Sequence, residues 1–183
     1  MTTLPDNVPV PVDDGSCDHL TGASLPAVTL PATDGRSVNL AALTGTIVLY
    51  CYPRTGRPDT ASPDGWSQIP GALGCTPQAC SFRDFHGEIQ RLGAQVFGIS
   101  TQETAYQREA VDRLGLTFAM LSDQYLELAH ALALPLFTAE GVTLNRRVTL
   151  IAREGVIVKV FYPVFPPDDH VEEVVAWLNA HTD

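Results

Sequence analysis

The segment TIVLYCY (residues 46–52) constrains the fold most, because every residue in it is apolar, β-branched or aromatic. A run of this kind is typical of a strand that is buried on both faces of a sheet. A second buried strand is expected at AQVFGIS (94–100), after a segment over residues 76–92 in which apolar residues recur at helical spacings of three and four. Buried strands that are joined by helices indicate an α/β domain.

The rest of the chain continues this alternation of strands and helices. An N-terminal β-hairpin is expected around Asp34-Gly35, and a second hairpin where RVTLIA and VIVKVFY flank Arg153-Glu154-Gly155. The other expected elements are a helix over 101–115, a strand over 116–122, a helix over 123–134 capped by Asp123, and a C-terminal helix over 166–180 with the core stripe Val171, Val174, Val175 and Leu178.

Charge and composition argue against several classes of function. The chain of 183 residues has a formal charge of −10 and an isoelectric point near 4.7, which disfavours binding to nucleic acid or to anionic lipid. It has no apolar run of the roughly 18 residues that a membrane span requires, and its first residues lack the basic start and apolar core of a secretory signal. We therefore expect a cytoplasmic protein, in which four cysteines are too few for a disulfide scaffold.

Two stretches show no periodicity. Residues 1–22 are rich in Pro and Asp and are expected to form a flexible arm in front of one domain over residues 23–183. Within that domain, about residues 54–73 carry many Gly, Pro, Asp and Ser residues, and a loop of this length is usually functional or an insertion. Cys17 in the arm is expected to be an exposed free thiol, with a second resolving role as the alternative, and Cys51 in mid-strand is expected to be a small core residue.

Cys75 is expected at the first residue of a helix. Gly74 ends the loop before it, and Pro77 is tolerated only in a first helical turn. The unpaired N–H groups of a first turn favour an anion and therefore the thiolate. A helix terminus supplies about 0.3–1 kcal/mol and about 2 at best, whereas a hundredfold shift towards the thiolate takes about 2.7 kcal/mol. A reactive Cys75 therefore needs a second cationic or hydrogen-bonding group.

Cys80 follows five residues later in the same expected helix. In an intact α-helix the two Cα atoms would be about 8.6 Å apart, beyond the ~7 Å that a disulfide tolerates. If the pair oxidises, the first turns must unwind. Two inert thiols remain an alternative, whereas a metal site is disfavoured because only His86 lies nearby, and the C-x-x-C of a dithiol oxidoreductase is absent.

The motifs YCYP and GCTPQACSFRD resemble the active-site region of peroxiredoxins of the Q type, also called bacterioferritin comigratory proteins. The likeness extends over about residues 24–180. It implies a thioredoxin-like fold, with a central mixed sheet, flanking helices and an N-terminal β-hairpin. It also implies a thiol-dependent peroxidase.

The resemblance assigns roles to individual residues. Cys75 matches the peroxidatic cysteine and Cys80 the resolving cysteine, and Gln78 matches the polar residue one turn after the nucleophile. Arg147 matches the arginine that begins the family's R-x-[ST]-F strand, and is the second cation that the energy argument requires. Arg146 beside it is easily confused with it, but the register of the strand favours Arg147.

One departure from the family concerns the hydroxyl near the nucleophile. The family places Thr three residues before the nucleophile, where this chain has Ala72. Pro53 still follows the strand as in the family, although an insertion separates it from Cys75. We therefore expect Thr55 to bond the thiolate and orient the peroxide; the alternatives are that Thr55 is only a turn residue and that Thr60 or a backbone N–H serves instead.

The resemblance implies a reaction and its partners. A hydroperoxide oxidises the peroxidatic cysteine to a sulfenic acid, the resolving cysteine forms an intramolecular disulfide with it, and thioredoxin or a similar dithiol resets the enzyme. No metal, haem or flavin is needed. Trp66 and Pro70 are candidates to cover the pocket, and a monomer is implied, although the arm and the inserted loop could support a dimer. The competing interpretation is a redox-responsive binding module with the same cysteine pair and little turnover.

Overall fold

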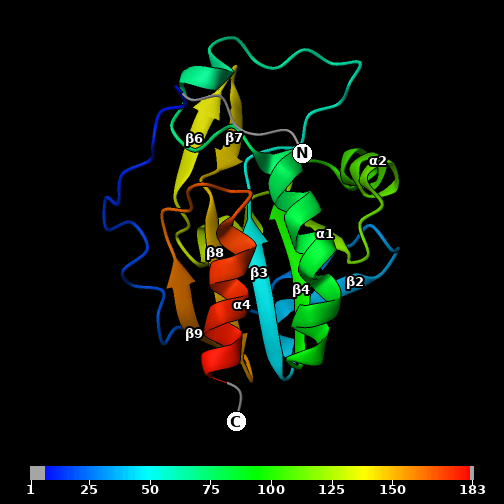
Figure 1. Ribbon diagram of the computed structural model, residues 1–183, viewed down its shortest axis with the longest axis vertical. Helices are drawn as coiled ribbons and strands as arrows, with labels where there is room; N and C mark the ends of the chain where they lie inside the picture. The colour runs from blue at the N-terminus through cyan, green and yellow to red at the C-terminus, as the bar shows by residue number, and fades with distance from the viewer. Residues whose placement is uncertain (1–6, 182–183) are drawn as a thin grey trace.

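A five-stranded mixed sheet forms the centre of the computed structural model, which describes residues 7–181 (Figure 1). The strand order is β5-β4-β3-β8-β9, in which β5, β4 and β3 are parallel to one another and β8 and β9 are antiparallel to their neighbours. The bounds of these strands are β3 Thr46–Cys51, β4 Ala94–Ser100, β5 Met120–Ser122, β8 Val148–Arg153 and β9 Val156–Phe161. The predicted α/β fold with a central mixed sheet is confirmed.

Strand β3 shows why a continuous apolar run was required at the centre. Val48 and Tyr50 point to one face of the sheet, whereas Ile47, Leu49 and Cys51 point to the other, and all five are buried. The first face is covered by α1 and α4, which lie side by side in front of the sheet in Figure 1. The helices are α1 Cys75–Arg91, α2 Thr104–Leu114, α3 Glu127–Ala131 and α4 His170–Ala180.

The opposite face is covered by α3, by the N-terminal hairpin and by the N-terminal arm. The hairpin pairs β1 (Thr29–Pro31) with β2 (Ser37–Asn39), as predicted, and a short 3-10 helix, η1 (Leu40–Ala42), follows it. α3 is shorter than the helix expected over residues 123–134. Its N-cap residue is Leu126 and not the expected Asp123, although the Asp123 carboxylate accepts the N–H groups of Leu128 and Ala129 in the first turn.

A hairpin that the sequence did not reveal lies at one end of the molecule. It pairs β6 (Leu136–Ala139) with β7 (Val142–Asn145), and the loop of residues 54–73 arches over it (Figure 1). That loop contains the 3-10 helix η2 (Trp66–Gln68), whose Trp66 packs with Ala139 and Leu144 in a small apolar cluster of its own. The inserted loop is thus packed against the hairpin.

Residues 7–22 of the expected arm lie along the body, whereas its residues 1–6 fall outside the described part of the chain, and the expectation of an exposed Cys17 was wrong. Cys17 is 5% exposed and Leu20 is fully buried, because both side chains belong to the core on this face of the sheet. Burial, together with nearby aspartates, raises the pKa of Cys17 to about 12, so this thiol is protonated and unreactive at neutral pH. The boundary between arm and domain at residue 22 stays a prediction.

None of the helices within residues 7–181 is both long and apolar enough to cross a membrane.

Candidate active site

Cys75 is the first residue of α1, as its flanking residues predicted. Gly74 holds the preceding N-cap position at φ 98°, a conformation that favours glycine, and contributes no side-chain cap. The first-turn N–H groups therefore have no side-chain oxygen from the cap residue. The Cys75 side chain is only 4% exposed, and its Sγ lies 3.6 Å from the carbonyl oxygen of Ala72.

Arg147 brings a guanidinium to this sulfur from the residue just before β8. Its Nη2 atom lies 3.3 Å from Cys75 Sγ and also donates to the carbonyl oxygens of Leu73 at 3.0 Å and Gly71 at 3.2 Å. Arg147 is 4% exposed, so its charge is little screened by solvent. Arg146 instead places its guanidinium 5.8 Å from the ring centre of Phe137. The structure thus brings Arg147, and not Arg146, to the cysteine.

Gln78 fixes the other arm of the guanidinium. It is fully buried one turn into α1, and its Oε1 atom accepts a hydrogen bond from Arg147 Nη1. Acceptors on both arms hold the guanidinium in one orientation, so its charge is positioned before any substrate arrives. Cys75, Gln78 and Arg147, which the sequence singled out, therefore lie together.

Thr55 is buried close to the end of β3, but its hydroxyl is directed to another partner. Its Oγ1 atom donates to Oε1 of Gln102 at 3.3 Å, and its N–H donates to the same oxygen at 2.9 Å, while Nε2 of Gln102 donates back to the Thr55 carbonyl at 3.1 Å. No hydrogen bond joins Thr55 to Cys75 among the described residues. Pro53 follows the end of β3, as expected, and it is buried.

Gln102 was not identified from the sequence. It is the second residue after β4, and the carboxyl ends of parallel strands such as β3 and β4 meet at one edge of a sheet. The position of Gln102 shortly after a predicted parallel strand is the sequence feature from which it could have been identified.

Cys80 lies in the second turn of the same helix, partly exposed and with a free thiol like the other three cysteines. Nη1 of Arg83 lies 3.8 Å from its Sγ, so a cation also faces the second sulfur, a neighbour that the sequence did not suggest. Arg83 Nη1 donates to the carbonyl of Leu114 at 2.6 Å, and the Ser81 hydroxyl donates to the carbonyl of Asp168 at 2.6 Å. Side chains just after Cys80 thus connect α1 by hydrogen bonds to segments outside the helix.

Cys51 is fully buried, and burial raises its pKa, as befits a core residue.

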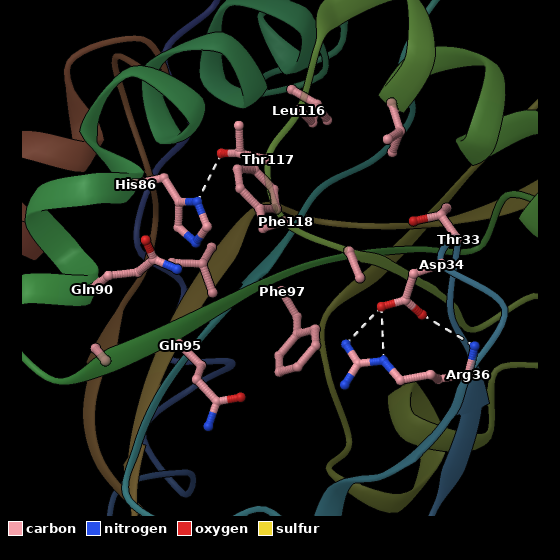
Figure 2. A pocket seen from close by; sticks show the side chains of 14 residues that line it. Thr33, Asp34, Arg36, His86, Gln90, Gln95, Phe97, Leu116, Thr117 and Phe118 are labelled. Carbon is pink, nitrogen blue, oxygen red and sulfur yellow. Dashed lines mark hydrogen bonds and ion pairs between the residues drawn. The ribbon is translucent and has the colours of Figure 1, made fainter.

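A separate cavity of about 380 Å³ opens between α1, β4 and the N-terminal hairpin (Figure 2). The Asp34–Arg36 ion pair lies on one side of it, and His86, whose Nδ1 is 2.7 Å from the hydroxyl of Thr117, lies on the other. Neither Cys75, Cys80 nor Arg147 lines this cavity, so it is not where Cys75 would react. Within residues 7–181 no group of His, Cys, Asp and Glu side chains is arranged to hold a metal ion.

The chain matches the protein family described as Redoxin over residues 20–178. Peroxiredoxin Q, chloroplastic, of Suaeda salsa is 30% identical over 162 residues, which cover 87% of this chain and 67% of that protein. The corresponding protein of Arabidopsis thaliana is 29% identical over the same length, again 87% of this chain and 67% of that protein. The chain therefore spans about two thirds of the length of these plant relatives.

Solved structures share the fold. Peroxidoxin BcpB of Mycobacterium tuberculosis has a TM-score of 0.72 at 24% identity, covering 89% of this chain and 98% of that one. A bacterioferritin comigratory protein of Xanthomonas campestris, studied for its alkyl peroxide reduction activity, has a TM-score of 0.67 at 21% identity, covering 97% of this chain and all of that one. Both are similar in architecture to the fold in Figure 1.

Proposed function

The chain belongs to the Redoxin family, and from that membership we propose that it is a thiol-dependent peroxidase of the peroxiredoxin Q type with Cys75 as its peroxidatic residue. The observation that carries the proposal is the contact of 3.3 Å between Arg147 Nη2 and Cys75 Sγ at the first residue of α1. The guanidinium and the N–H groups of the first helical turn both stabilise negative charge on the sulfur and on an oxygen beside it.

The first step oxidises the sulfur. The Cys75 thiolate attacks the terminal oxygen of a hydroperoxide, so that an S–O bond forms while the O–O bond breaks. The sulfur becomes a sulfenic acid, and the other oxygen leaves with the electron pair and takes a proton to give an alcohol or water. Arg147, held in place by Gln78, stabilises the charge on this leaving oxygen.

The second step forms a disulfide between Cys75 and Cys80. The Cys80 thiolate attacks the sulfenic sulfur, an S–S bond replaces the S–O bond, and the oxygen leaves as water. Because both cysteines belong to one continuous helix, its first turns unwind before the bond can close. A dithiol such as thioredoxin then reduces the disulfide by exchange and is itself oxidised. We further propose that this cycle takes place in the cytoplasm and that the protein acts as a monomer.

The test is stopped-flow reaction of the reduced full chain with hydrogen peroxide, followed by intrinsic tryptophan fluorescence. Cys75→Ser should lose the fast phase, and the wild type should gain one disulfide per chain, as counted by thiol titration and mass spectrometry. Cys80→Ser should keep the fast phase but stop at the sulfenic acid and lose turnover with thioredoxin. A wild type that reacts no faster than a free thiol would refute the peroxidase and favour a redox-responsive binding module.

A further inference from the structure

Arg83 is the charged residue in contact with the second cysteine of the proposed reaction. It follows Cys80 by three residues on α1, a spacing at which two side chains are neighbours on one face of a helix. Its Nη1 atom lies 3.8 Å from Cys80 Sγ. Its Nε and Nη2 atoms both lie 2.8 Å from Oδ1 of Asp84, so Nη1 is the arm of the guanidinium that meets the sulfur. The second sulfur thus has a guanidinium of its own, like the first.

The charge beside Cys80 is opposite in sign to that of the protein as a whole. The chain carries a formal charge of −10, and negative charge disfavours a thiolate. Arg113 of α2 is another arginine near Cys80, but its Nε and Nη2 atoms bind the carboxylate of Glu109. Among the described residues it makes no hydrogen bond to this sulfur. Arg83 therefore supplies the direct cationic contact.

We propose that Arg83 is a catalytic residue of the second step, in which it stabilises the Cys80 thiolate that attacks the sulfenic acid. The proposal rests on the peroxidase function argued above. Cys80 gives its proton to solvent, and the guanidinium stabilises the negative charge left on the sulfur. The thiolate then attacks the sulfur of the Cys75 sulfenic acid, so that an S–S bond replaces the S–O bond. Hydroxide leaves and takes up a proton to give water.

The guanidinium is anchored outside the part of α1 that unwinds. Its Nη1 atom donates to the carbonyl oxygen of Leu114, the last residue of α2, at 2.6 Å. Ser81, directly after Cys80, donates from its hydroxyl to the carbonyl oxygen of Asp168 at 2.6 Å. Because both anchors lie beyond residue 80, Arg83 stays beside Cys80 while the first turns open and the sulfenic acid approaches.

The first test measures the thiolate of Cys80 without any peroxide. In the reduced full chain with Cys75→Ser, alkylation by iodoacetamide, an uncharged reagent, reports the thiolate, and peptide mass spectrometry follows Cys80 alone. Adding Arg83→Gln should slow this alkylation at pH 7 by about twofold to fivefold, the effect of losing one charge contact that solvent partly screens.

Two further variants separate charge from structure. Arg83→Lys keeps the charge but loses the fork that binds Asp84 and Leu114 together, and it should restore most of the alkylation rate. Arg91→Gln is the matched control, since it removes the same charge from an exposed position on α1, about 16 Å from Cys80 along the helix axis. It should keep the wild-type rate.

The second test follows the two steps with Cys75 intact. Oxidation by hydrogen peroxide, whose rate rises with peroxide concentration, should be unchanged in Arg83→Gln. Closure of the disulfide, which does not depend on peroxide concentration, should slow. A sulfenic acid that waits longer is open to further oxidation, so Arg83→Gln should accumulate more Cys75 sulfinic acid at the same excess of peroxide, as counted by mass spectrometry.

A folded Arg83→Gln protein with wild-type alkylation and closure overturns the proposal. An equal slowing in Arg91→Gln, or an Arg83→Lys protein as slow as Arg83→Gln, overturns it too. Should circular dichroism show that Arg83→Gln is unfolded, the salt dependence of Cys80 alkylation in the chain with Cys75→Ser decides. Sodium chloride should slow alkylation by screening the nearby cation, whereas screening of the overall negative charge alone would speed it.

Alkylation that salt leaves unchanged or accelerates overturns the role of Arg83. A wild type without a fast phase in peroxide refutes the peroxidase itself, on which the proposal rests. Fast oxidation of Cys75 together with an alkylation of Cys80 that is insensitive to Arg83 refutes only the role of Arg83.

Discussion

Nη2 of Arg147 lies 3.3 Å from Sγ of Cys75, although 72 residues separate the two along the chain. Because the guanidinium faces the position where negative charge develops, Arg147→Gln should lower the second-order rate constant for oxidation by hydrogen peroxide by about 10²–10³-fold. Arg147→Lys should restore only part of the rate, since a single ammonium cannot reach Gln78 and Cys75 in the same fork. Stopped-flow fluorescence of the reduced variants measures both effects.

Arg146→Gln tests whether the position or only the charge matters. It removes the same charge from the adjacent residue, whose guanidinium lies near the ring of Phe137. We expect it to slow the reaction far less than Arg147→Gln does. Equal losses in the two variants would mean that the general positive potential, rather than the contact with Cys75, supports the reaction.

The hydrogen bonds just after Cys80 set the limit of helix unwinding. Ser81 is tied to the carbonyl of Asp168 and Arg83 to the carbonyl of Leu114, so oxidation should release residues 75–80 and leave the remainder of α1 in place. Hydrogen–deuterium exchange of reduced and oxidised protein should show faster exchange in residues 75–80 and unchanged protection over residues 84–91.

Ser81→Ala is the informative variant for this boundary. It removes one of the two ties, so the fast-exchanging segment of the oxidised protein should extend further into α1, while exchange in the reduced protein changes little. Oxidation that leaves the exchange of residues 75–80 unaltered would contradict the unwinding step.

The start of α1, with Cys75 as its first residue, could be predicted because the residues that determine it are adjacent in the sequence. Gly74 and Pro77 fix where the helix begins, and the alternating burial of β3 follows directly from its apolar run. The pairing of Arg147 with Cys75 came from the family's strand register, since no short-range pattern reports a contact between distant segments. The burial of Cys17 and the β6–β7 hairpin were missed for the same reason, because their stability comes from packing against segments far away in the sequence.

For Thr55, the partner expected from the sequence differs from the partner in the structure: the hydroxyl was expected to bond Cys75, but it bonds Gln102. Its hydroxyl and its N–H both donate to Gln102, which suits a buried hydroxyl that fixes the turn after β3. Thr55→Val should therefore lower the free energy of unfolding by about 0.5–1.5 kcal/mol, the net contribution of one hydrogen bond, because Oε1 of Gln102 keeps the N–H of Thr55 as a donor. The rate constant with hydrogen peroxide should fall by much less than in Arg147→Gln. A rate loss as large as that of Arg147→Gln, with unchanged stability in urea, would instead assign Thr55 to peroxide orientation.

His170 makes the stability of the fold depend on pH. It is the first residue of α4, and its ring is buried, with Nε2 2.9 Å from Oγ1 of Thr149 and Nδ1 3.1 Å from Oε2 of Glu173. Burial lowers the pKa of His170, and the charge of Arg147 acts in the same direction, whereas Glu173 opposes it. Burial also lowers the pKa of His86 on α1. Both imidazoles therefore bind a proton less readily in the folded protein than in the unfolded chain.

The sign of the effect follows from where the proton binds. Below the ordinary histidine pKa of about 6.5 the unfolded chain takes up protons that the folded protein does not, so acid favours unfolding. The free energy of unfolding of the reduced protein, measured in urea, should fall as the pH drops from 7.5 to 5.5, and His170→Gln should flatten this dependence. His130→Gln, which alters an exposed histidine, is the matched control and should keep the wild-type slope. A slope in His170→Gln as steep as that of the wild type would show that the ion pair with Glu173 compensates for burial and that His170 does not govern the response to acid.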